Sequence, residues 1–144
     1  MHWLTEQLQN LQELLRRYTS LKGLAEARAV SPRSAEEARR AFFSAVSLVT
    51  IEIQKRPGIA ACFVCHDGLL VEHAGSAASF EALAAVAQSC VEVARNAAAS
   101  SLLGDIRQMV LVGADSKLAI FSLGPIAVGI QSPVNTNLAQ SLAA

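Results

Sequence analysis

The chain has 144 residues, of which 52% are hydrophobic and 17% are charged, with twelve basic and twelve acidic side chains. This length suits one domain with a single substantial core. Residues 1–56 carry nine Lys and Arg and six acids, and the rest carries three bases and six acids. Because this asymmetry is mild and the bases form no stripe, a nucleic-acid-binding surface is excluded.

Signals for export or membrane insertion are not recognisable. The first residues, MHWLTE, contain neither the basic nor the apolar region of a signal peptide. Residues 118–144 carry no charge, but glycines and prolines interrupt them too often for a membrane-spanning helix. We therefore expect a cytoplasmic protein without membrane insertion, whose three cysteines are free thiols.

The first predicted element is a helix over residues 3–19, ended by Lys22-Gly23. Its apolar side chains recur at alternating steps of four and three and form one narrow seam: Leu4, Leu8, Leu11, Leu15 and Tyr18. Such a seam packs on another helix of the same chain or on a second subunit. We favour the same chain, because the seam is short for an independent coiled coil.

A second helix is predicted from Ser34 to about Lys55, after a connector over residues 24–33. Ser34 and Glu37 fit a capping box, in which a hydroxyl and a carboxylate bind free N–H groups of the first turn. Residues 49–53 alternate between apolar and polar, which also fits a strand. The cap and a continuous apolar face favour the helix; that face is Ala38, Ala41, Phe42, Ala45 and Val49.

A hairpin and a long helix follow. Residues 59–65 are an unbroken apolar run, typical of a strand covered on both faces. Asp67-Gly68 predicts a two-residue turn into a second strand over residues 69–74. The next helix is predicted over residues 80–99, where 14 of 20 residues are apolar, so we expect it to be buried on more than one side. Ser79 can cap it.

Three strands and a short helix close the chain. The strands are predicted at residues 109–112, 118–123 and 126–130, separated by glycine-containing turns. Asn135 or Thr136 could cap a terminal helix that runs through Leu142.

The order of these elements, and the segments RPGIAACFVCHDGLLVEHAG and MVLVGADSKLAIFSLGPIAVGIQSPVNTNLAQSLA, resemble the roadblock (dynein light chain 7) family, in particular its bacterial gliding-motility regulators. The resemblance implies an α+β, profilin-like αββαβββ(α) fold with a five-stranded antiparallel sheet and helices on both faces. Residues 34–144 form this domain, and residues 1–33 add an N-terminal helix and connector. Family members form homodimers, serve as platforms for Ras-like small GTPases or larger signalling and motility assemblies, and generally catalyse nothing.

The resemblance also implies a dimer in which the third strand pairs with its copy and the long helices lie side by side. The predicted interface is Ala84, Ala87, Val91, Ala94, Arg107, Met109, Val110, Leu111 and Val112. The third strand is apolar on both faces, and pairing would remove an edge that otherwise invites aggregation. The alternative is that this strand is internal and the alanines face the chain's own sheet.

The Cys62-Phe-Val-Cys65-His66 segment matches a haem-attachment pattern. In a strand, however, Cys62 and Cys65 point to opposite faces and cannot grip one haem or metal ion. A two-residue turn would place Cys62 opposite His73, but two ligands are too few for a structural zinc site. We predict no cofactor, no metal and no catalytic residues, because no nucleophile motif or phosphate-binding loop is present.

The long helix also carries a polar strip, Gln88, Glu92, Arg95 and Asn96. It is either a solvated helix face or the footprint of a partner. The sequence thus predicts a non-catalytic homodimeric regulator or scaffold that binds a Ras-like GTPase or a signalling or motility assembly. The alternative is a small-molecule sensor or a purely self-associating scaffold.

Overall fold

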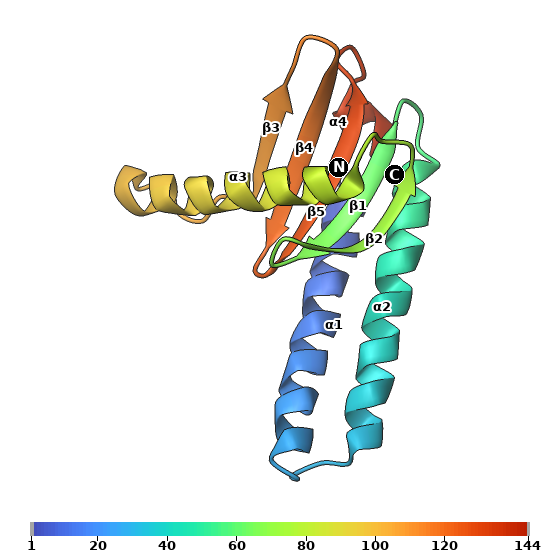
Figure 1. The fold of residues 1–144 in the computed structure, drawn as a ribbon, viewed down its shortest axis with the longest axis vertical. Coiled ribbons are helices and arrows are strands. Elements are labelled where there is room, and N and C mark those ends of the chain that lie inside the picture. Colours follow the sequence, from blue (N-terminus) through green and yellow to red (C-terminus); the bar gives the residue numbers. More distant parts are fainter. Residues whose placement is uncertain (1, 144) are drawn as a thin grey trace.

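A five-stranded antiparallel sheet separates two layers of helices in the computed structural model, which describes residues 2–143 (Figure 1). The order across the sheet is β2-β1-β5-β4-β3, so β2 and β3 are its edges. This confirms the predicted α+β fold. The strands are β1 (Ala61–His66), β2 (Leu69–Gly75), β3 (Gln108–Val112), β4 (Ser116–Leu123) and β5 (Ile126–Pro133).

Two long helices form a hairpin, one end of which packs on one face of the sheet while the other end extends beyond it, and a third long helix crosses the opposite face (Figure 1). The helices are α1 (His2–Glu26), α2 (Pro32–Gln54), α3 (Phe80–Ser101) and the short α4 (Leu138–Ser141). The four leucines of the predicted seam are buried in a core shared with α2 and the sheet. The seam of α1 therefore packs within the chain, as predicted.

The predicted end of the first helix was wrong. Gly23 lies inside α1, which continues to Glu26. Arg28 then adopts a left-handed conformation with φ of 59°. The Ala29 N–H bonds the Leu24 carbonyl at 2.8 Å, which satisfies an end carbonyl of the helix. The connector between the helices is accordingly shorter than predicted.

The predicted capping box of the second helix was also wrong. Ser31 caps α2 and accepts a hydrogen bond from the Ser34 N–H at 3.3 Å, with Pro32 in the first turn. Proline suits that position because its missing N–H would have no partner in the helix. Glu37 pairs instead with Arg33, at 3.3 Å between Nε and Oε1. Residues 49–53 are helical, and Ala41 of the predicted apolar face is exposed.

The hairpin turn forms as predicted, but the strand register does not. Asp67 and Gly68 both have positive φ, 49° and 81°, as a two-residue primed turn requires. A bulge then adds one residue to β2, so that Cys62 lies opposite Ala74 and His73 lies opposite Phe63. The predicted pairing of Cys62 with His73 is therefore wrong.

The sheet buries side chains on both faces. Cys62 and Val64 face the α1–α2 core, whereas Phe63 and Cys65 face the α3 core. Phe63 lies opposite Gly129 in β5, and a Cβ added to Gly129 would lie 2.1 Å from the Phe63 ring. The glycine therefore makes room for the aromatic ring.

The long helix α3 begins as predicted, with Ser79 accepting a hydrogen bond from the Ala82 N–H at 3.2 Å. The expectation that it is buried on more than one side was wrong: its buried residues, Ala84, Ala87, Val91 and Ala94, lie along one stripe. Asn137, rather than Asn135 or Thr136, caps α4. Asn137 is the residue directly before the first helical position, where the cap must lie.

Candidate interaction site

Strand β3 has one unpaired side. The Ser122 N–H bonds the Arg107 carbonyl, and the Gly113 N–H bonds the Ser116 carbonyl, both at 2.9 Å. In an antiparallel pair, every second residue of a strand directs its backbone N–H and C=O groups toward the neighbouring strand. The odd-numbered residues from 107 to 113 therefore direct these groups toward β4. The N–H and C=O groups of Gln108, Val110 and Val112 therefore point away from the sheet.

The side chains of this edge are apolar and exposed. Val110 is 44% exposed, Leu111 41% and Val112 67%, and Met109 is half-buried against the α3 core. The alternative that this strand is internal is therefore wrong. An apolar edge strand with unpaired backbone groups is a template for pairing with another strand.

Helix α3 crosses its face of the sheet and extends past β3 (Figure 1). Its C-terminal end has Leu102 in a left-handed conformation, with φ of 60°. Leu102 is 97% exposed and Leu103 73%. Within residues 2–143, no strand lies beneath this overhanging end. Its residues are nevertheless mostly alanine and leucine.

The predicted interface residues fall into two groups. Ala84, Ala87, Val91 and Ala94 are buried in the single chain, and the first three belong to the core between α3 and the sheet. Arg107 and the residues of β3 lie at the exposed edge. Val86 and Val93 are not among the predicted interface residues, yet they are 44% and 68% exposed on the flank of α3. Their spacing of seven residues places them on the same side of the helix, and this could have been recognised in the sequence.

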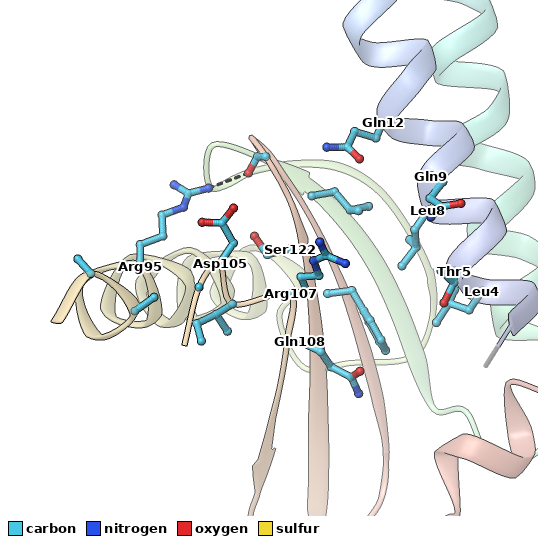
Figure 2. A pocket seen from close by; sticks show the side chains of 17 residues that line it. Leu4, Thr5, Leu8, Gln9, Gln12, Arg95, Asp105, Arg107, Gln108 and Ser122 are labelled. Atoms are coloured by element: carbon cyan, nitrogen blue, oxygen red, sulfur yellow. Dashed lines mark hydrogen bonds between the residues drawn. The ribbon is translucent and has the colours of Figure 1, made fainter. Parts of the chain in front are cut away.

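The polar strip of α3 anchors the helix to two turns. Gln88 lies against Gly68 in the β1–β2 turn and donates a hydrogen bond to Glu92, at 3.2 Å. Arg95 donates from Nη2 to the Gly124 carbonyl in the β4–β5 turn, at 2.7 Å (Figure 2). Gln88 and Arg95 thus contact turns of the sheet, and three of the four residues, Glu92, Arg95 and Asn96, are exposed.

A cleft of about 840 Å³ opens at the end of the sheet that carries the β4–β5 turn. Figure 2 shows its walls: α1 with Thr5, Gln9 and Gln12, and the sheet edge with Arg107 and Gln108. Within residues 2–143, the Arg107 guanidinium makes no hydrogen bond or ion pair. The additional N-terminal helix therefore creates a partly polar cleft next to β3.

Among the side chains that the structure describes, the cysteines and histidines do not gather at one place. Cys62 and Cys65 point to opposite faces of β1, as predicted. His66 lies beside Asp67, at 3.5 Å between Nδ1 and Oδ2, and His73 stacks on Phe80 with ring centroids 4.4 Å apart. Among the described residues, no three His, Cys, Asp or Glu side chains could share a metal ion. No described helix is long and apolar enough to cross a membrane.

Burial of Cys62 predicts a pH dependence of stability. Loss of solvation raises the pKa of its thiol from 9.0 to about 12. Between these values the unfolded chain releases a proton that the folded chain retains, so the free energy of unfolding should fall as pH rises. Urea unfolding from pH 8.5 to 11 should show this decline, and Cys62→Ala should make it shallower. Equal slopes in the two proteins would contradict the assignment.

An antiparallel sheet of this order between one long helix and a second helical layer defines the roadblock-like fold, and solved structures confirm it. A roadblock/LC7 domain from Streptomyces avermitilis matches with a TM-score of 0.60 at 19% identity, over 65% of this chain and 82% of that chain. Myxococcus xanthus MglB matches at 0.62 and 18%, over 67% and 76%. The gliding protein MglB from Thermus thermophilus matches at 0.57 and 13%, over 65% and 75%. The sequence itself matches no family profile and no curated protein significantly.

Proposed function

We propose that this protein is a non-catalytic homodimeric regulator or scaffold that binds a Ras-like small GTPase or a related motility or signalling assembly. The observation that carries the proposal is the exposed edge of β3, past which the C-terminal end of α3 extends (Figure 1). The edge offers backbone groups and apolar side chains, and the helix offers a cover for whatever strand pairs there.

A second copy satisfies both features at once. Suppose that β3 pairs antiparallel with its copy about a two-fold axis at Val110. Gln108 then lies opposite Val112 of the partner, and the outward-pointing backbone N–H and C=O groups of the two strands form hydrogen bonds with each other. The overhang of each α3 then covers the partner's β3. Such a self-complementary contact is the usual basis of two-fold homodimers. The proposed interface is therefore Arg107 and β3, with the exposed C-terminal end of α3.

The partner class is supported by the fold. The matched structures include gliding proteins, and the family resemblance implies small-GTPase platforms. Glu92, Arg95 and Asn96 are the exposed members of the polar strip, and Arg95 is bonded to the Gly124 carbonyl. We propose Glu92 and Asn96 as part of the partner footprint. Fold alone does not assign a partner, so the assignment needs a direct test.

The test is retention of a GTPase from native cytosol on the tagged protein. One sample receives a GTP analogue and the other receives GDP. A Ras-like GTPase retained in one nucleotide state, and released when Glu92 and Asn96 are both changed to lysine, would support the proposal. Recovery of copies of this chain alone, in both nucleotide states, would overturn the GTPase assignment and leave a self-associating scaffold.

The cleft favours a second candidate function, a small-molecule sensor. Its volume lies within the range typical of ligand sites, and its lining mixes apolar side chains with polar ones such as Gln12, Arg107 and Gln108. A sensor should show ligand-dependent shifts in melting temperature without a protein partner. Loss of those shifts on Arg107→Ala would place the ligand in this cleft.

A further inference from the structure

The outer face of α2 carries a stripe of residues at alternating steps of four and three. Its members are Glu37, Ala41, Ser44, Leu48, Ile51 and Lys55, and all are exposed. Leu48 is 64% exposed and Ile51 45%, whereas Phe42 and Val46 of the same helix are buried on its other side. The spacing is that of a coiled-coil seam, but nothing in residues 2–143 covers it.

We propose that this stripe is a second self-association surface, which binds the same stripe of another copy in antiparallel orientation. The reason is that residues at equal distances on either side of Val46 are complementary in size or charge. Antiparallel pairing centred there places Glu37 opposite the partner's Lys55, which are of opposite charge. It also places the small Ala41 opposite the partner's Ile51 and the small Ser44 opposite the partner's Leu48.

Each of these layers is complementary in its own way. The outer layers pair opposite charges, and the inner layers put a large side chain against a small one, which allows helices to interdigitate. Because the operation is two-fold, every layer occurs twice and the same patch serves both copies. The parallel alternative places Glu37 against Glu37 and Lys55 against Lys55, so it opposes like charges at both ends.

The pairs that Glu37 and Lys55 make within one chain do not compete strongly. Glu37 lies 3.3 Å from Arg33, and Lys55 lies 3.2 Å from Glu52. Both pairs are exposed and lie within one helix, where solvent screens them. A single pair of helices makes a small contact, so we expect the association to be weak and rapidly reversible. Disulfide trapping is the suitable measurement.

The experiment uses the full chain with Glu37→Cys and Lys55→Cys, together and separately. Cys90→Ala is added to each to remove the half-buried native thiol, since Cys62 and Cys65 are buried. Positions 37 and 55 are about 27 Å apart along one helix, so they cannot bond within a chain. We expect mild oxidation to cross-link the double variant at least tenfold faster than either single variant.

The outcomes are decisive and do not depend on β3. Cross-linking of Glu37→Cys alone as fast as the double variant would indicate parallel or random contact and overturn the proposal. So would failure of the double variant to cross-link. Repeating the experiment with β3 blocked by Val110→Glu and Val112→Glu should leave the cross-link intact. Loss of the β3 dimer with retention of this cross-link would show that the two interfaces are independent.

A charge exchange provides a second readout without cysteines. Glu37→Lys alone places a lysine opposite the partner's Lys55. It should weaken self-association at high protein concentration by about tenfold. Adding Lys55→Glu to the same chain restores opposite charges in the antiparallel pair and should recover most of it. Failure of the second substitution to recover association would contradict the proposed orientation.

Discussion

Changing Val110 and Val112 to glutamate together is expected to convert the proposed β3 homodimer into single chains. Both side chains are exposed in the single chain, so the fold should survive. In the proposed pairing, Val110 faces its own copy, and the glutamates would oppose one another across the two-fold. Like charges in an interface cost several kcal/mol, so the dimer dissociation constant should rise by about 100-fold or more. Sedimentation equilibrium gives the mass directly.

A matched control is available at the opposite edge of the sheet. Leu69 in β2 is 74% exposed, more than Val110 or Val112, so Leu69→Glu adds a charge to an exposed apolar site on an edge strand. This variant should keep the circular dichroism of the original protein and the two-chain mass that the proposed β3 dimer predicts. A two-chain mass for the β3 double variant, with unchanged folding, would place the dimer interface elsewhere.

Changing Gly129 to alanine is expected to destabilise the fold by about 3 kcal/mol, at the upper end of the usual range for overpacking a core. The added Cβ would lie 2.1 Å from the Phe63 ring, and Phe63 is fully buried. The ring must therefore move within a core that has no room for it. Urea denaturation at neutral pH measures the loss as a lower transition midpoint.

Two further substitutions test the cause of that loss. Phe63→Leu in the Gly129→Ala background removes the ring edge and should recover part of the stability, a coupling that a double-mutant cycle measures. Gly23→Ala should act in the opposite direction, because a Cβ there meets nothing within 4 Å and Gly23 lies inside α1. Alanine in a helix interior should stabilise by about 0.5–1 kcal/mol. A neutral Gly129→Ala would contradict the packing account.

The sequence predicted elements well where a local chemical requirement decided the structure. Asp67-Gly68 needs positive φ at both positions, and Ser79 supplies an oxygen one residue before α3. It predicted poorly where several residues could meet the same requirement. Ser31 and Ser34 can each cap α2, and Pro32 decides for Ser31 because proline suits the first turn.

The register and the burial of α3 depended on contacts distant in sequence. The bulge in β2 shifts Cys62 to face Ala74, and the apolar hairpin carries no local signal for it. The apolar count of α3 suggested burial on more than one side, but Val86 and Val93 are exposed in the single chain. Hydrophobicity predicts that a surface is to be covered, without saying by which chain.

The proposed role depends above all on pairing at β3, and amide hydrogen exchange tests it most directly. The N–H groups of Val110 and Val112 point outward, whereas those of Met109 and Leu111 point toward β4 and serve as internal references. We predict that all four are protected at high protein concentration, and that Val110 and Val112 alone lose protection on dilution. Rapid exchange at Val110 and Val112 at high concentration, with Met109 and Leu111 protected, would show a free edge and contradict the homodimer.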